Sequence, residues 1–187
     1  MLYPKVTNIN KKNQLIKWLI ALSVLVGVIC VLINQIVDKQ LHWSFLCIAG
    51  IVYSWITVLY SLKKNVNIAS HVLVQAISAS LLIVAIDKII GYQGWSIEIA
   101  IPIIITIANS TMAILAIVSH KRYARYVVYQ IGIFLFSLLP VFLVMMKIQN
   151  INPPIIIATL IALITFIITI AICGKPIFQE MNKRFHI

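Results

Sequence analysis

Residues 87–102, DKIIGYQGWSIEIAIP, separate two long apolar runs and contain two of the four acidic residues of the chain. Gly91 can end the preceding helix in a left-handed conformation, and Gly94 permits a tight reversal. Ser96 is placed to cap the helix that follows, and Glu98 lies in its first turn, where the helix dipole favours a negative charge. The stretch therefore predicts a turn between two antiparallel helices.

The composition of the whole chain is typical of a protein embedded in a membrane. Of its 187 residues, 62% are hydrophobic and 10% are charged, and the mean hydropathy is +1.05. A water-soluble domain usually has about a quarter of its residues charged. We therefore predict an integral membrane protein.

Six apolar segments have the length that a membrane-spanning helix requires, about 20 residues for a hydrocarbon core of about 30 Å. They lie at 16–37, 43–62, 67–90, 97–118, 126–147 and 155–173. Short connections join them, so consecutive helices are expected to be antiparallel neighbours. Pro102 and Pro140 are expected to disturb the fourth and fifth helices, because proline has no backbone N–H. The predicted fold is all-α, a compact bundle of six transmembrane helices, with a basic N-terminus (1–14), a transmembrane domain (15–173) and a basic tail (174–187).

Lysine and arginine are concentrated at alternate connections and at both ends of the chain. Among the 15 basic residues, Lys39, Lys88 and Lys147 are the exceptions, lying at the opposite side. Basic residues close to a span resist translocation, so both termini are predicted to be cytoplasmic. The net charge of +11 is then a cytoplasmic fringe, which is attracted to anionic lipid headgroups and gives no reason to expect nucleic acid as a partner. The candidate lipid or partner contacts in this fringe are Lys121, Arg122, Arg125, Lys183 and Arg184.

The outer turn has a second interpretation besides a structural one. Asp87 and Glu98, with Trp95 between them, could form the mouth of a site for a cationic solute or a divalent ion. Trp95 also suits the headgroup interface of a membrane. Two carboxylates without further oxygen ligands make an incomplete site for a hard cation, so the turn explains more of this stretch.

Neutral polar side chains recur at helical spacing inside the predicted spans. Ser54, Thr57 and Ser61 share a face of the second helix, and similar polar faces occur on the third, fourth and fifth helices. One interpretation is hydrogen bonding between helices, worth about 0.6 to 2 kcal/mol per contact. The other is a polar cavity between helices two to five, and both require these faces to point away from lipid. The candidate cavity residues are His71, Gln75, Ser78, Asn109, Ser110 and Gln130.

Sequence motifs for catalysis or cofactor binding are absent. Haem ligation needs two histidines at similar depth, and only His71 lies within a predicted span. Cys30, Cys47 and Cys173 lie in apolar runs without a CxxC pair. The chain contains no GxSxG, HExxH or P-loop sequence. We therefore predict no metal, no cofactor and no enzymatic activity, with an enzyme acting on lipid headgroups as a distant alternative.

Short landmarks along most of the chain resemble a known family. They are Tyr3-Pro4, Ile33-Asn34, Trp43, YSWITVLYSL at 53–62, the D…G…GWS pattern of 87–96, Ile101-Pro102 and the terminal NKRFHI. Together they resemble an uncharacterised family of six-helix membrane proteins from low-GC Gram-positive bacteria, many of whose members begin with a cytoplasmic zinc ribbon. The resemblance implies the bacterial cytoplasmic membrane and no known reaction. Because no CxxC module precedes Tyr3, metal binding is not carried over.

Two classes of function fit these features. The first is a subunit that binds or transports a small solute in a neutral polar cavity. The second is a non-enzymatic accessory or regulatory protein that binds another membrane protein through its basic cytoplasmic face. A ligand that copurifies with the protein would favour the first class, and a copurifying partner protein would favour the second.

The predicted topology can be tested by labelling single cysteines in intact cells. Cysteines placed at Lys64, Arg122 and Lys183 should be shielded from an impermeant thiol reagent, because the membrane separates them from it. A cysteine at Gln93 should be labelled. Labelling of the Arg122 position from outside would overturn the model with both termini in the cytoplasm.

Overall fold

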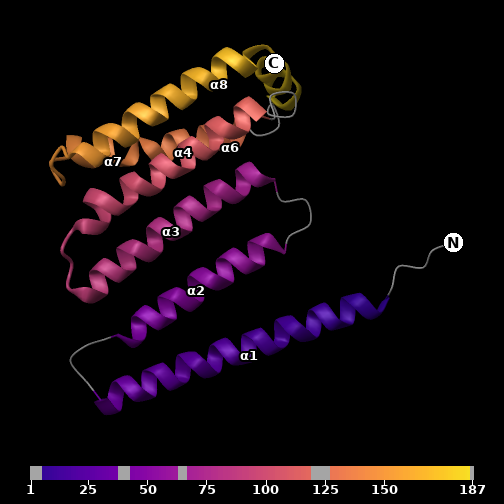
Figure 1. The fold of residues 1–187 in the computed structure, drawn as a ribbon, viewed down its shortest axis with the longest axis vertical. Helices are drawn as coiled ribbons and strands as arrows, with labels where there is room; N and C mark the ends of the chain where they lie inside the picture. The colour runs from indigo at the N-terminus through magenta and orange to yellow at the C-terminus, as the bar shows by residue number, and fades with distance from the viewer. Residues whose placement is uncertain (1–5, 38–42, 63–66, 119–126, 186–187) are drawn as a thin grey trace. The chain divides into compact units, whose positions relative to one another are not determined.

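The computed structural model describes the chain except for residues 1–5, 38–42, 63–66, 119–126 and 186–187, and the described part is helical without strands (Figure 1). The elements are α1 (Val6–Val37), α2 (Ser44–Ser61), α3 (Ile68–Ile90), the π-helix η1 (Ser96–Ala100), α4 (Ile101–Val118), α6 (Val127–Ser137), α7 (Leu139–Met145) and α8 (Pro153–Phe185). The predicted all-α fold is thus confirmed for this part of the chain.

Six helical stretches are long and apolar enough to cross a membrane. They cover 16–37, 44–61, 68–90, 96–118, 128–145 and 153–171, so each boundary lies within two residues of its predicted position. The chain is therefore a multi-pass membrane protein. Beyond these stretches, α1 begins earlier, at Val6, and α8 continues to Phe185, so helix extends into the basic segments near both ends.

The chain divides within α2 into two compact units, residues 1–54 and 55–187. In the first unit, Asn34 near the end of α1 meets Ser44 at the start of α2. The Ser44 backbone N–H donates to Asn34 Oδ1 at 3.3 Å, and both residues are buried. The first turn of a helix leaves backbone N–H groups without intrahelical partners, and Asn34 accepts from one of them.

The second unit is built around α4, which packs against α3, α6 and α8 (Figure 1). Small side chains fill much of the contact, as close approach of helices within a membrane requires. One core cluster contains Ala69, Ala76, Ala108, Met112, Ala116 and Ile133 from α3, α4 and α6. A second contains Ile101, Ile105 and Ala158 from α4 and α8. At Gly132 of α6 an added Cβ would lie 3.0 Å from the Leu73 side chain, so α6 approaches α3 closely there.

The turn between α3 and η1 is organised by one carboxylate. Asp87 is 0% exposed, and its oxygens accept from the backbone N–H groups of Gln93 at 3.0 Å and Gly94 at 3.1 Å. Ser96 donates its hydroxyl to Asp87 Oδ2 at 2.7 Å and its backbone N–H to the same oxygen at 3.4 Å. The predicted capping role of Ser96 is therefore wrong, because the N-cap position is Trp95, and the Ser96 N–H at the start of η1 is bonded to the Asp87 side chain. The carboxylate is a stronger acceptor than a hydroxyl oxygen, so it receives this N–H together with those of Gln93 and Gly94.

Gly91 has the predicted left-handed conformation, and Gly94 also has a positive φ. Gly91 ends α3 with φ 114°, and Gly94 has φ 82°. Between them Tyr92 adopts φ 43°, and its backbone N–H donates to the Asp87 carbonyl at 2.7 Å. This bond closes the last turn of α3 in the manner of a Schellman motif.

Pro102 disturbs the start of the fourth span by a π-turn. The backbone N–H of Ile101 donates to the Ser96 carbonyl, five residues back, and Pro102 has no N–H to donate. The Ile97 carbonyl therefore receives no hydrogen bond from Ile101, whose N–H is bonded to Ser96, and none from Pro102, which has no N–H. Gln149, in the connection before α8, donates to that carbonyl from Nε2 at 3.0 Å. The lost helical bond is thus replaced by a contact between η1 and the connection before α8.

The predicted kink at Pro140 is also present. The fifth span is divided into α6, which ends at Ser137, and α7, which begins at Leu139. The Leu138 N–H turns to the Leu135 carbonyl at 3.2 Å, a tighter turn than an α-helix makes. The cause is the proline ring, which clashes with the carbonyl four residues earlier.

Replacement of Asp87 by asparagine should lower the melting temperature of the purified protein by several degrees. The substitution puts an amide N–H₂ among four groups that already donate, so at least one donor loses its partner. Glu98→Gln is the matched control, because Glu98 lies in the same turn but makes none of these bonds. Equal melting temperatures for Asp87→Asn and the wild-type protein would contradict the role of Asp87 in holding the turn.

Candidate functional site

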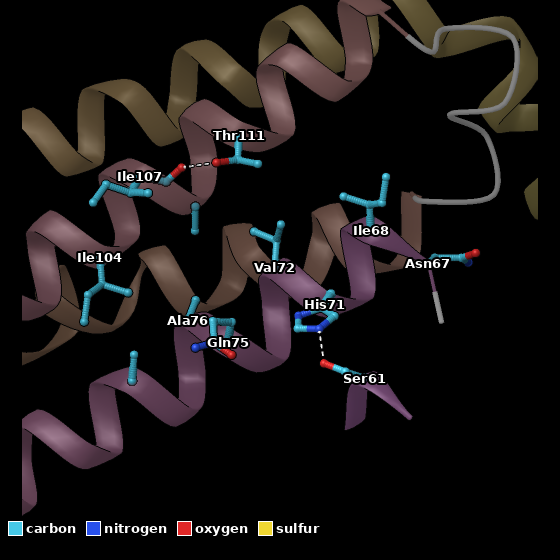
Figure 2. Close-up of a pocket in the computed structure, with 12 residues that line it drawn as sticks. Ser61, Asn67, Ile68, His71, Val72, Gln75, Ala76, Ile104, Ile107 and Thr111 are labelled. Carbon is cyan, nitrogen blue, oxygen red and sulfur yellow. Dashed lines mark hydrogen bonds between the residues drawn. The ribbon is translucent and has the colours of Figure 1, made fainter. Parts of the chain in front are cut away.

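A cavity of about 600 Å³ lies between α3 and α4 in the second unit (Figure 2). Its polar lining residues are Ser61, Asn67, His71, Gln75 and Thr111, and the remainder of the lining is isoleucine, valine and alanine. Binding pockets for small molecules have volumes of about 300–1,000 Å³ and mostly apolar walls with a few polar groups. This cavity has both properties.

Helical periodicity places these residues on common faces. On α3, Ile68, His71, Gln75 and Ala79 follow one another at spacings of three or four, so they stand above one another along the helix. Ile104, Ala108 and Thr111 have the same spacing on α4. Side chains from both helices therefore line one cavity, with the polar groups of α3 near its N-terminal end (Figure 2).

Polar contacts between α2 and α3 hold two of the lining side chains. Thr57 Oγ1 donates to Gln75 Oε1 at 3.2 Å, and Ser61 Oγ lies 2.8 Å from His71 Nε2. Tyr60 adds an edge-on ring contact to His71, with centroids 5.7 Å apart. We call this set of four hydrogen-bonding residues, Thr57, Ser61, His71 and Gln75, the α2–α3 clasp. It fixes the positions of His71 and Gln75 at the cavity.

The cavity opens on the surface of the second unit. Ile68 and Ile107 both line it, and they are 62% and 61% exposed. Both residues lie within stretches that are apolar enough to cross a membrane, 68–90 and 96–118. The border of the opening is therefore apolar.

The structure separates the six candidate cavity residues. His71 and Gln75 line the cavity, whereas Ser78, Asn109, Ser110 and Gln130 do not. Ser78 is buried and donates to the Gln75 carbonyl at 3.2 Å, and Gln130 is 1% exposed on α6. Three polar lining residues were not among the candidates: Ser61, Asn67 and Thr111. Ser61 shares a polar face with Thr57 in the sequence, but Asn67 and Thr111 give no comparable signal.

Asn109 joins α4 to α6. Its side chain is 0% exposed, and Nδ2 donates to the Ile105 carbonyl at 2.9 Å and to Ser137 Oγ at 2.8 Å. Ser137 in turn donates to the Ile133 carbonyl at 2.8 Å. Asn109 thus corresponds to the interhelical hydrogen bonding that the sequence indicated as one of two interpretations.

The residues proposed for an outer mouth lie away from this cavity. Asp87 is 16 residues beyond His71 on α3, about 24 Å along the helix axis. Its carboxylate is enclosed by the turn, and Glu98 and Trp95 are partly buried beside it. Within the described residues, no group of three histidine, cysteine, aspartate or glutamate side chains is arranged to hold a metal ion.

The candidate cytoplasmic contacts cannot be placed at the site. Lys121, Arg122 and Arg125 lie outside the described residues. Lys183 and Arg184 belong to α8, whose side chains are described only as far as residue 171. Their proposed contacts with lipid or a partner stay predictions.

A double-mutant cycle should measure the bond between Asn109 and Ser137. Asn109→Ala and Ser137→Ala should each lower the free energy of unfolding in mixed micelles, and the pair should show a coupling energy of about 0.6 to 1.7 kcal/mol. A cycle of Asn109→Ala with Ser80→Ala is the control, because Ser80 is a buried serine that donates only to the Ala76 carbonyl. Strict additivity of Asn109→Ala and Ser137→Ala would contradict a direct contact.

Comparison with known proteins gives a family but no activity. No curated protein and no solved structure is significantly similar to the chain. A family model described as "Family of unknown function (DUF6320)" matches residues 3–187. Because this match covers almost the whole sequence, the chain belongs to the DUF6320 family.

Proposed function

We propose that this multi-pass membrane protein binds a small, largely apolar solute in the cavity between α3 and α4, as a binding or transport subunit. The observation that carries the proposal is the cavity itself, about 600 Å³ in volume, with apolar walls and a few polar side chains. A cavity of this size with an open, apolar border can admit a small molecule and present polar side chains to it.

The α2–α3 clasp supports a binding role. His71 and Gln75 are held from the α2 side by Ser61 and Thr57, at 2.8 and 3.2 Å. Polar side chains fixed in this way lose little freedom when a ligand binds, which favours affinity and defined orientation. Hydrogen bonding between helices alone would need the clasp but would not need the adjoining cavity.

The opening of the cavity supports a solute that arrives from the lipid phase. Ile68 and Ile107 remain exposed at its border, in stretches that are apolar enough to cross a membrane. A strongly hydrated solute would have to lose its water shell in order to enter by this route. The solute is therefore one that already partitions into the bilayer.

The membrane and the orientation form part of the proposal. The distribution of lysine and arginine supports an orientation with both termini inside, and the family resemblance supports the bacterial cytoplasmic membrane. The N-terminal end of α3, which carries Asn67 and His71, then lies toward the cytoplasmic leaflet. Binding at this place requires no covalent chemistry, so the proposed role is not enzymatic.

The experiment compares the small molecules that purified protein retains. Ala79→Leu places a larger side chain in the cavity, whereas Ala85→Leu makes the same change on α3 away from the lining. Mass spectrometry of solvent extracts should find a molecule bound to wild-type and Ala85→Leu protein, and reduced about ten-fold in Ala79→Leu. Melting temperatures of both variants verify that they fold.

Two results would count against the proposal. Equal retention of every molecule by Ala79→Leu and Ala85→Leu would show that the cavity is not the binding site. Absence of any retained molecule from the wild-type protein, together with a stoichiometric partner protein from native membranes, would favour the accessory role instead.

A further inference from the structure

We infer that the bound molecule is an amphipath whose polar end is a hydrogen-bond donor, a hydroxyl or an amine, and this inference rests on the proposed function. The polar atoms of the lining differ in whether they can still donate or accept a hydrogen bond. Hydroxyl groups and imidazole nitrogens have fixed numbers of protons, so the bonds that they already make determine what they can offer a ligand.

Ser61 determines the proton position on His71. Ser61 Oγ lies 2.8 Å from the Thr57 carbonyl and 2.8 Å from His71 Nε2. A carbonyl can only accept, so the single hydroxyl proton of Ser61 goes to Thr57. Both bonds can exist together only if His71 Nε2 carries a proton and donates it to Ser61. In the neutral imidazole, Nδ1 is then a hydrogen-bond acceptor.

Thr111 offers lone pairs to the cavity from the opposite helix. Its hydroxyl donates to the Ile107 carbonyl at 2.8 Å, as Figure 2 shows. The proton of this hydroxyl is therefore used within α4, and the oxygen retains its capacity to accept. Ser61 is in the same position, because its proton is committed to Thr57 and only one of its two lone pairs receives His71.

The remaining polar lining residues do not discriminate between ligands. The amides of Asn67 and Gln75 can both donate and accept, and Gln75 Oε1 already receives the Thr57 hydroxyl. The described lining contains no lysine, arginine, aspartate or glutamate. Three atoms of the lining can therefore accept a hydrogen bond from a ligand: His71 Nδ1, Thr111 Oγ1 and Ser61 Oγ. Their surroundings are apolar, where a polar ligand group without a hydrogen-bond partner costs free energy.

The shape of the lining orients such a molecule. Ser61, Asn67 and His71 lie at the N-terminal end of α3, whereas Ile104 and Ala79 lie farther along the cavity. A donor head near His71 would leave the hydrocarbon chain against isoleucine and alanine. Such a molecule can be a long-chain alcohol or a long-chain amine, since both present N–H or O–H protons.

The test uses four photoactivatable probes with the same twelve-carbon chain, which carries a diazirine. They are dodecanol, dodecylamine, dodecyl methyl ether and dodecanoic acid. Full-length protein in nanodiscs of neutral phospholipid is irradiated with each probe, and labelled residues are mapped by mass spectrometry. The alcohol or the amine should label the lining segments of α3 and α4 about ten-fold more than the methyl ether, which is the effect of about one hydrogen bond.

Two substitutions connect the preference to named atoms. His71→Phe and Thr111→Val should each remove most of the preference for the alcohol or amine over the ether. Thr159→Val is the matched control, because Thr159 donates to the Ile155 carbonyl at 2.8 Å in the same way but does not line the cavity. If His71→Phe does not fold, Thr111→Val alone tests the donor preference, because it changes only the α4 side of the lining and leaves the α2–α3 clasp intact.

The outcomes separate the inference from the proposed function. Labelling of the lining by the ether or the acid as strongly as by the alcohol and amine would overturn the donor preference while leaving the cavity as a binding site. The exposed α8 residues Ile157, Leu160 and Ile164 give the background level of labelling. Failure of all four probes to label the lining above this level would overturn the proposed function itself. The more strongly labelling probe of the alcohol and amine pair identifies the head group.

Discussion

The bilayer interior contains no water, so every hydroxyl proton in the spans must find an acceptor within the protein. Most serine and threonine side chains here use the carbonyl four residues earlier, as Thr165, Thr159 and Thr106 do at 2.7 to 2.9 Å. A hydroxyl that has given its proton to its own helix presents only lone pairs to its neighbours, so polar faces of serine and threonine become faces of acceptors.

Two of the interhelical polar contacts in the second unit follow from this constraint. Asn109 donates to Ser137, and the arrangement at Ser61 requires His71 to donate, so in both cases a side chain with N–H groups meets a hydroxyl that has already given its proton away. The same chemistry has different outcomes at the two places. Around Asn109 the helices close completely, whereas the α2–α3 clasp borders an open cavity.

The ends of the spans meet the same requirement with other groups. At the turn between α3 and η1 Asp87 gathers four donors, and at the π-turn Gln149 replaces a helical bond that Pro102 cannot make. Both side chains are buried, and each joins a connection to a helix end. Asp87 and Gln149 therefore act in holding the turns, and the cavity depends on polar groups near the other end of α3.

The sequence by itself determined the six spans to within two residues, the left-handed conformation at Gly91, and the disturbance of the fifth helix before Pro140. These features are local, because they depend on apolar length, on the missing Cβ of glycine and on the missing N–H of proline. It did not distinguish Gln75, which lines a cavity, from Asn109, which joins two helices, or show that Ser96 would bond to Asp87 rather than cap a helix. Those outcomes depend on which helix faces lie opposite one another, and many contacts between small residues of distant segments decide that only in the tertiary structure.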